Sequence, residues 1–256
     1  MRSTPSQVPM RSALPRRVEP EWLDELPADD PRAVRSRRDL KRVNRWMGSM
    51  SILLRELDRV VLEHAGDAAA AAPPHLVELG AGDGSLMLRI ARQRKAQWPG
   101  MRLTLLDREP VVDAATLAEF RKLGWQVDVA AVDVFDWLAQ PHDERRNIVC
   151  TNLFVHHFAG QQLEQLLQGI ALMTGTQAFV CLEPRRSRFA LGGSHLLGAI
   201  GCNAVTRHDA VLSVHAGFRD GELGALWPSA SQHGSEWNVR ESAAGIFSHL
   251  FAATRA

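Results

Sequence analysis

The chain has 256 residues, 45% of them hydrophobic, which is enough to bury the core of one α/β domain with appendages. Its 30 basic residues are balanced by 29 acidic ones, and this formal net charge of +1 argues against a general nucleic-acid-binding protein. The three cysteines form no CxxC pair and are typical of buried thiols in a reducing compartment. Because we find no secretory leader and no run of 18 apolar residues, we expect a cytoplasmic protein.

Two segments precede the first expected strand. Residues 1–20 are rich in Pro, Ser and Arg, and we expect them to form a disordered tail. Residues 21–74 are expected to form a helical extension followed by a linker. Within it, Asp30 before Pro31 is an N-cap signature, and apolar residues then recur every three or four positions. This period predicts one long helix or two consecutive ones, ending near Gly66.

From residue 75 onward, strands and helices are expected to alternate. Apolar runs predict strands within 75–81, 101–109, 125–131, 147–158 and 176–184, with helices at 85–98, 110–124 and 159–174 between them. Such alternation predicts a doubly wound α/β domain whose mostly parallel sheet is covered on both faces. After a stretch at about 185–235 that reads as long and irregular, segments 236–242 and 246–256 predict a hairpin.

A glycine-rich turn follows the first of these strands, in the segment VELGAGDGS at 77–85. Gly80, Gly82 and Gly84 stand between a strand and a helix, where the backbone usually passes close to a ligand. The NAD fingerprint requires its third glycine where Ser85 stands, and the Walker pattern is missing. Glu78 would repel a pyrophosphate, but it suits a cationic ligand such as the amino acid part and sulfonium of S-adenosylmethionine (SAM).

Acidic residues also follow the next two strands. Asp107 ends the second strand, where a carboxylate can accept hydrogen bonds from both hydroxyls of a ribose. Asp133 follows the third strand and can accept from an adenine amino group, although the neighbouring Asp136 is a competitor for this position.

With these residues identified, the sequence resembles the class I (Rossmann-like) SAM-dependent methyltransferases. The resemblance covers residues 75–184 and the terminal hairpin, and four motifs carry it in order: VELGAGDGS, LLDRE, AVDVFD and NIVCTNLFVHHF. It implies SAM as the cofactor and a seven-stranded sheet with an antiparallel last strand. The implied cofactor-binding residues are Glu78, Gly80, Gly82, Gly84, Asp107, Asp133 and Asn152. The VHHF stretch is similar to the small-molecule branch that includes ubiquinone- and menaquinone-type methyltransferases.

Two histidines follow the fourth strand, His156 and His157. Transfer to a phenol with a pKa of about 10 gains from a base near neutral pH, and histidine fits that role. Either imidazole is therefore a candidate catalytic base, the alternative being that VHHF only caps the next helix. The [DN]PP[YFW] motif of enzymes that methylate exocyclic base nitrogens is missing, and so is the paired-glutamate loop of protein arginine methyltransferases. Both absences favour a small-molecule acceptor and an oxygen or carbon nucleophile over a base nitrogen. We expect a partly apolar acceptor that is methylated at a hydroxyl group.

The stretch at 185–235 is expected to be a substrate-binding insert, because it mixes apolar residues with a few polar groups. His208 and Asp209 within it form a second acid–base candidate. The five histidines of the C-terminal half lack tight ligand spacing, so no metal site is expected.

Arginines at helical spacing form a cationic stripe in the N-terminal extension: Arg35, Arg38, Arg42 and Arg45. Three interpretations stay open, namely a solvated face, a lid over the acceptor, and a peripheral contact with an acidic membrane. We expect no specific nucleic-acid partner. The alternatives to a small-molecule enzyme are a protein or RNA methyltransferase that docks through this helix, and a SAM-binding scaffold without turnover.

Overall fold

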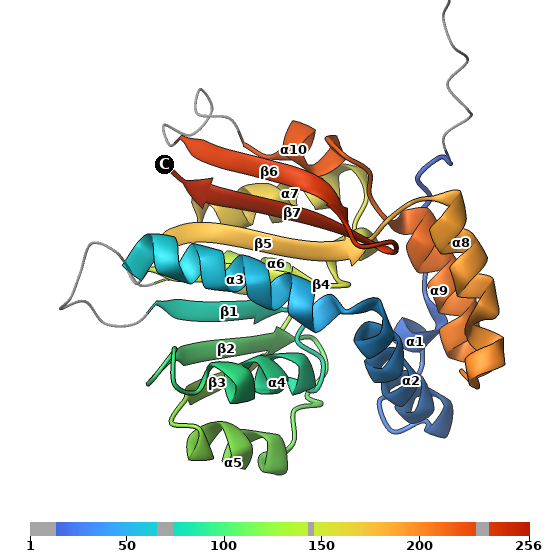
Figure 1. Ribbon diagram of the computed structural model, residues 1–256, viewed down its shortest axis with the longest axis horizontal. Helices are drawn as coiled ribbons and strands as arrows, with labels where there is room; N and C mark the ends of the chain where they lie inside the picture. The colour runs from blue at the N-terminus through green and yellow to red at the C-terminus, as the bar shows by residue number, and fades with distance from the viewer. Residues whose placement is uncertain (1–13, 66–73, 143–145, 229–235) are drawn as a thin grey trace, which may run out of the picture.

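The computed structural model describes residues 14–65, 74–142, 146–228 and 236–256. Its seven strands form one sheet in the order β3-β2-β1-β4-β5-β7-β6 (Figure 1). They are β1 (His75–Leu79), β2 (Arg102–Asp107), β3 (Gln126–Ala131), β4 (Asn147–Asn152), β5 (Thr176–Pro184), β6 (Trp237–Ala244) and β7 (Ser248–Arg255). Strands β1 to β5 pair in parallel, whereas β7 runs antiparallel to both β5 and β6. The predicted α/β sheet with an antiparallel last strand is confirmed.

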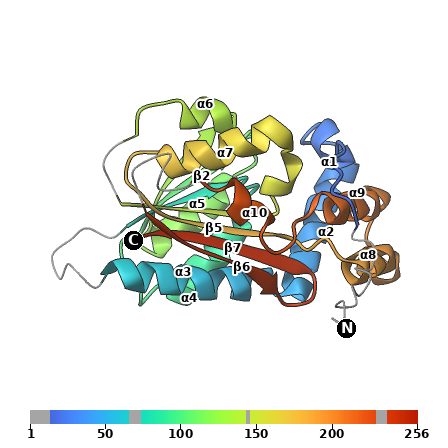
Figure 2. The same ribbon diagram turned by 90° about the horizontal axis from the view of Figure 1, so that it is seen from above.

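Helices cover both faces of the sheet (Figure 2). One face carries α3 (Ser49–Ala65), α4 (Ser85–Arg94) and α5 (Ala114–Lys122), and the other carries α6 (Val134–Leu138), α7 (Gly160–Leu172) and α10 (Glu222–Leu226). Neighbouring residues of a central strand enter opposite cores: Leu76 packs with the first group of helices and Val77 with the second. This double burial explains why these strands are continuous apolar runs in the sequence.

A third group of helices lies beyond the carboxyl ends of the parallel strands (Figure 1). It consists of α1 (Trp22–Glu25), α2 (Pro31–Met47), α8 (Arg188–His195), η2 (Leu196–Ile200) and α9 (Ala204–Ala216). We call residues 14–47 together with 188–216 the cap. The cap therefore combines a segment that precedes β1 with one that lies between β5 and β6. It covers the sheet edge where ligands bind in open α/β folds.

After the short α1, the part of the N-terminal extension with the apolar period forms two helices, α2 and α3, as one of the two sequence interpretations predicts. Asp30 caps α2 by accepting a hydrogen bond from the N–H of Arg32, and α2 ends at Gly48, whose φ of 71° is left-handed. Of these two helices, α2 belongs to the cap, whereas α3 packs against the sheet. Residues 1–13 of the predicted tail and 66–73 around the predicted linker lie outside the described residues.

Two expectations about secondary structure are wrong. The helix expected from Pro110 begins at Ala114, because Asp113 caps it by accepting from the N–H of Thr116. The stretch expected to be irregular is largely helical between 188 and 226. Two glycines inside α8 and polar residues inside α9 obscure the helical period, although the caps at Ser187 and Asn203 mark where these helices start. No helix within the described ranges is long and apolar enough to cross a membrane.

Candidate functional site

A cavity of about 610 Å³ opens at the carboxyl ends of the parallel strands. It lies where the strand order reverses between β1 and β4, which is the usual ligand position in a doubly wound sheet. The sheet side of its wall includes Gly80, Gly82, Leu106, Asp107 and Asp133. On the opposite side, the wall is formed by cap residues between 18 and 28 and by residues of α2. Its volume is in the ordinary range for a small-molecule site.

The three glycines of the loop after β1 differ in what a side chain at each position would meet. All three have positive φ, between 54° and 71°. A Cβ on Gly80 would lie 2.3 Å from the ring of Phe154, and one on Gly84 would lie 2.8 Å from Leu105. A Cβ on Gly82 would meet no atom within 4 Å, because this residue faces the cavity. Gly80 and Gly84 therefore permit close packing, whereas Gly82 leaves room for a ligand beside the backbone.

Both strand-end aspartates line the cavity. Asp107 accepts hydrogen bonds from the N–H groups of Gly82, at 2.7 Å, and Glu109, at 3.0 Å. Asp133 is exposed and caps α6 by accepting from the N–H of Phe135 at 2.8 Å. Asp136, the competitor considered in the sequence, is not among the lining residues. The fold thus brings a carboxylate from each of two neighbouring strand ends to one cavity.

Glu78 and Asn152 lie near the ends of the adjacent strands β1 and β4 and are not part of the cavity wall itself. Glu78 is buried, and this burial, together with the charges of Asp107 and Asp83, raises the pKa of its carboxyl to about 8. Its Oε2 and the Oδ1 of Asn152 are buried acceptors that find no hydrogen-bond donor within the described part of the chain. Such acceptors fit a ligand that brings a cationic, donor-rich group.

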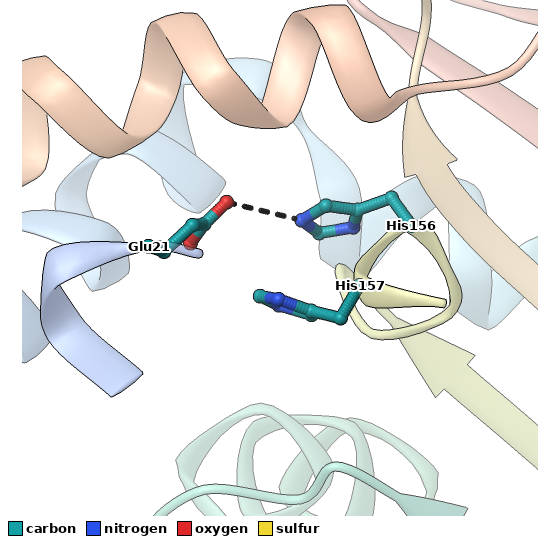
Figure 3. A group of neighbouring side chains, drawn as sticks. All are labelled: Glu21, His156 and His157. Atoms are coloured by element: carbon teal, nitrogen blue, oxygen red, sulfur yellow. Dashed lines mark ion pairs between the residues drawn. The ribbon is translucent and has the colours of Figure 1, made fainter. Parts of the chain in front are cut away.

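The two histidines of η1 (Val155–His157) have different environments (Figure 3). His156 is only 2% exposed, with Nδ1 2.7 Å from Glu183 Oε2 and Nε2 3.4 Å from Glu21 Oε1. Burial disfavours its charge, but the Glu183 and Glu21 carboxylates outweigh that effect and raise its pKa to about 9. His157 lines the cavity, and its Nδ1 lies 3.3 Å from Asp24 Oδ2.

Glu183, at the end of β5, holds the loop that carries these histidines. It is fully buried, and its Oε1 accepts hydrogen bonds from the N–H groups of Phe154, at 3.0 Å, and Val155, at 2.9 Å. Burial opposes its charge, but the bond and charge of His156 lower its pKa overall. The sequence analysis missed Glu183, although an acid ending the apolar run TQAFVCLEP is the same signal that singled out Glu78.

Residues 14–26, which we call the N-terminal strap, bring two further acids to the histidines, Glu21 and Asp24. The Asp209 carboxylate of α9 accepts from the backbone N–H groups of Trp22 and Leu23, both at 3.0 Å. The ring of His208 stacks on Trp22 with 3.7 Å between centroids. His208 and Asp209, the second acid–base candidate of the sequence, thus hold the strap and do not line the cavity.

Arg16 fastens the strap to the loop after β4. Its guanidinium donates to the carbonyl oxygens of Phe158 and Ala216, each at 2.8 Å, and lies 4.4 Å from the centroid of the Phe218 ring. Burial and the nearby Arg186 lower the pKa of Arg16 from its ordinary value. These contacts place Glu21 and Asp24 over η1.

Helix α2 forms part of the same wall. Arg37 and Leu40 line the cavity, and Lys41 forms an ion pair with Asp83 of the glycine-rich loop. Asp39, the one acid among the predicted basic residues, is buried and accepts from the N–H of Asn203 at 2.7 Å. The predicted cationic stripe lies on the exposed side of α2, and it comprises Arg35, Arg38, Arg42 and Arg45.

A second, apolar crevice of about 80 Å³ adjoins the cavity. Leu40 and Leu153 line both spaces. The other lining residues come from α2, the end of β5, α8, η2, α9 and the β6–β7 turn, and the polar side chains among them are Ser194 and Ser213. Leu153 has a φ of 56°, which is strained for a leucine and typical of residues held by their surroundings at a functional site.

Comparisons with known proteins identify the fold. No family model matches the sequence, and a search of curated proteins finds no match. The structure of the plantazolicin methyltransferase BpumL in complex with SAH is similar over 89% of this chain and 92% of that chain, with 11% identity and a TM-score of 0.59. Its complex with a triazolic desmethylPZN analog and SAH gives a TM-score of 0.61 over the same shares at 11% identity.

A further similar structure is that of LepI in complex with SAM, with a TM-score of 0.50 and 16% identity. This similarity covers 77% of this chain but 46% of the LepI chain. At these identities the comparisons show a shared fold.

Proposed function

We propose that this protein is a SAM-dependent methyltransferase that acts on a small, partly apolar acceptor, at a hydroxyl group. The observation that carries this proposal is the pair of buried acceptors without donors, Glu78 Oε2 and Asn152 Oδ1, beside a cavity at the switch point of the sheet. When bound, SAM supplies a methyl group on a sulfonium, whose departure leaves a neutral thioether. The protein's task is then to orient both molecules and to manage the acceptor's proton.

The residues on the sheet side would bind different parts of the cofactor. Glu78 and Asn152 would accept hydrogen bonds from its amino acid end, Asp107 from the ribose hydroxyls and Asp133 from the adenine amino group. Gly82 would leave space for the ligand beside the loop, while Gly80 and Gly84 keep the loop packed. The similarity to structures solved with SAH and SAM supports this assignment.

The cap would bind the acceptor. The apolar crevice adjoins the cavity through Leu40 and Leu153, and no charged side chain is among its described lining residues. A phenol- or quinol-like molecule could place its apolar part there and its hydroxyl in the cavity. The similar BpumL complex, which holds a desmethylPZN analog with SAH, supports a small-molecule acceptor. We therefore interpret α2 as a lid in preference to a docking surface for protein or RNA.

Of the two candidate bases, we assign His157 as the one that takes the proton of the acceptor hydroxyl. It lines the cavity, and Asp24 at its Nδ1 leaves Nε2 free to meet a hydroxyl. His156 is buried and, with a pKa of about 9, already carries a proton at neutral pH.

The proposal can be tested in two steps. Calorimetry with SAM and SAH should show one binding site per chain, and a scan of phenols, quinols and acids with methyl-labelled SAM should reveal an acceptor. Absence of binding by either cofactor form would overturn the proposal. Binding without turnover on any acceptor would favour the scaffold alternative, and full turnover by His157→Gln would refute the assigned base.

A further inference from the structure

The cluster at the meeting point of the strap and η1 contains more than a base and its neighbours. Glu21, His156 and His157 each offer one ligand atom, and these three atoms lie within 4.8 Å of one another (Figure 3). Glu21 comes from the strap and the histidines come from the loop after β4, so the set exists only when the cap is in place. Two imidazoles and one carboxylate are a recurrent ligand set for transition-metal ions that keep open coordination positions.

From this arrangement we propose a site for a divalent first-row transition-metal ion, of the Zn²⁺ or Fe²⁺ class, held by Glu21, His156 and His157.

The environment of His156 points to such a ligand. Its Nδ1 is hydrogen-bonded to Glu183 at 2.7 Å, and its buried Nε2 lies 3.4 Å from Glu21 Oε1, an ion-pair contact without the geometry of a hydrogen bond. A carboxylate on Nδ1 is what orients most metal-binding histidines, because it fixes the tautomer and leaves Nε2 for the ion. Glu183 itself is held by backbone N–H groups, so this orientation is rigid.

His157, at the edge of the cavity, also has a carboxylate beside its Nδ1. Asp24 lies 3.3 Å from its Nδ1, which leaves Nε2 for an ion. At metal–ligand distances of about 2.1 Å, ligand atoms of one ion lie roughly 3–3.5 Å apart, so the three atoms, now within 4.8 Å of one another, must approach by up to about 1.5 Å. The His157 side chain is 28% exposed and has the freedom to make that adjustment.

The proposed metal site lies at the cavity in which the proposed methyl transfer would take place. His157 and Asp24 line the 610 Å³ cavity, so an open coordination position there would face the proposed acceptor hydroxyl. With an ion bound, His157 is a ligand and not a free base, and the ion lowers the pKa of the hydroxyl in its place. This role rests on the proposed function, whereas ion binding itself does not.

The test is a titration of the chelator-treated full chain with Co²⁺ alone, followed by visible absorption and by calorimetry. We expect one Co²⁺ per chain, with ligand-field bands of a nitrogen- and oxygen-bound ion that Zn²⁺ abolishes by displacement. Glu21→Gln and His157→Gln should each weaken Co²⁺ binding at least tenfold. His195→Gln is the control, because His195 is an exposed histidine at the end of α8 that lies outside the set and makes no side-chain bond to the strap within the described residues. It should bind Co²⁺ as the wild type does.

Failure to bind Co²⁺ stoichiometrically, or equal affinity in Glu21→Gln, His157→Gln and wild type with native circular dichroism in all three, overturns the site. Calorimetry with SAH in excess chelator separates this outcome from the proposed function. SAH binding without Co²⁺ binding would refute the metal site alone, and Co²⁺ binding without SAH binding would refute the cofactor site alone.

Discussion

The two sides of the cavity are built in different ways. On the sheet side, Gly82, Asp107 and Asp133 occupy strand ends and the turns that follow them, so their positions depend on local backbone structure and parallel pairing. On the cap side, Glu21 and Asp24 reach the histidines only because the strap is bound to α9, for example by Trp22 to Asp209, 187 residues apart in the sequence. The comparison suggests that cofactor binding and acceptor handling can be disrupted separately.

The largest expected effect is on the sheet side. Asp107→Ala removes the carboxylate that faces the cavity and accepts from the N–H of Gly82, so we expect SAH affinity to fall by about a hundredfold or more. Asp113→Ala is the control, because Asp113 is an exposed aspartate nearby that only caps α5. It should cost about 1 kcal/mol of folding stability and leave SAH affinity unchanged. Equal losses of affinity in both variants would contradict the assigned role of Asp107.

On the cap side, Ala210→Trp should fill the apolar crevice that Ala210 lines. We expect turnover of an acceptor found in the scan to fall at least tenfold, with SAH affinity changed less than twofold. Ala225→Trp places the same ring at an exposed position of α10 and should leave both quantities unchanged. If Ala210→Trp lowered SAH affinity and turnover together, the two sides of the cavity would not be separable.

Glu78→Gln tests the buried carboxyl of the sheet side through pH. The folded pKa of about 8 lies above the ordinary value of 4.5, so the stability that Glu78 contributes is fully present below pH 4.5 and is lost as pH rises through 8. Glutamine cannot ionise, so the variant should gain stability relative to wild type across this range, by roughly 4 kcal/mol at pH 8. Denaturant unfolding at pH 5 and pH 8 measures the difference.

The same variant should bind SAH about tenfold more weakly at pH 8, since it no longer offers a carboxylate to the amino group. If the stability difference between wild type and Glu78→Gln were the same at pH 5 and pH 8, and SAH affinity were unchanged, Glu78 would not have the raised pKa that the structure indicates.

A smaller effect is expected from Asp209→Asn, which weakens the attachment of the strap. Its carboxylate accepts two backbone N–H groups, and an amide accepts more weakly, so we expect a loss of about 1–2 kcal/mol in local stability. Hydrogen exchange of residues 14–26 should become faster, while that of β1 and β4 stays as in wild type. Uniformly faster exchange throughout the protein would mean that the strap is not an independent unit.

The smallest effect is expected on the exposed side of α2. Arg35→Glu with Arg38→Glu reverses two exposed charges of the cationic stripe. If α2 is a lid whose inner side lines the cavity, SAH affinity should change less than twofold and stability by less than about 0.5 kcal/mol. Binding of wild type to anionic vesicles that the double variant loses would instead support the membrane interpretation.

The sequence was informative where chemistry follows local structure. The alternation of apolar runs predicted the sheet. Asp107 and Asp133 were singled out because they stand at or just after strand ends, and the fold brings both to one cavity. The cap was harder to predict, since α8 contains a glycine pair and α9 a polar stretch. The polar residues of α9 bind the strap and α2, as Asp209 does with Trp22 and Thr206 with Ser36.

The metal-type cluster is a sharper example of the same limit. The expectation of no metal site rested on the spacing of the five histidines of the C-terminal half, whereas Glu21 and His156 belong to segments that only tertiary contacts bring together. No local period or motif connects the strap with the loop after β4. Glu183, in contrast, carried a local signal at the end of β5 that a consistent reading of strand ends would have used.

The most direct test of the central claim is calorimetry of SAH binding near pH 7 in two buffers of different ionisation enthalpy. We expect one SAH per chain, with a proton released to the buffer, because Glu78 is protonated in the free protein and ionises beside the ligand's amino group. Glu78→Gln should remove that proton release. Absence of binding by both SAH and SAM, or binding with identical proton release in Glu78→Gln, would contradict that claim.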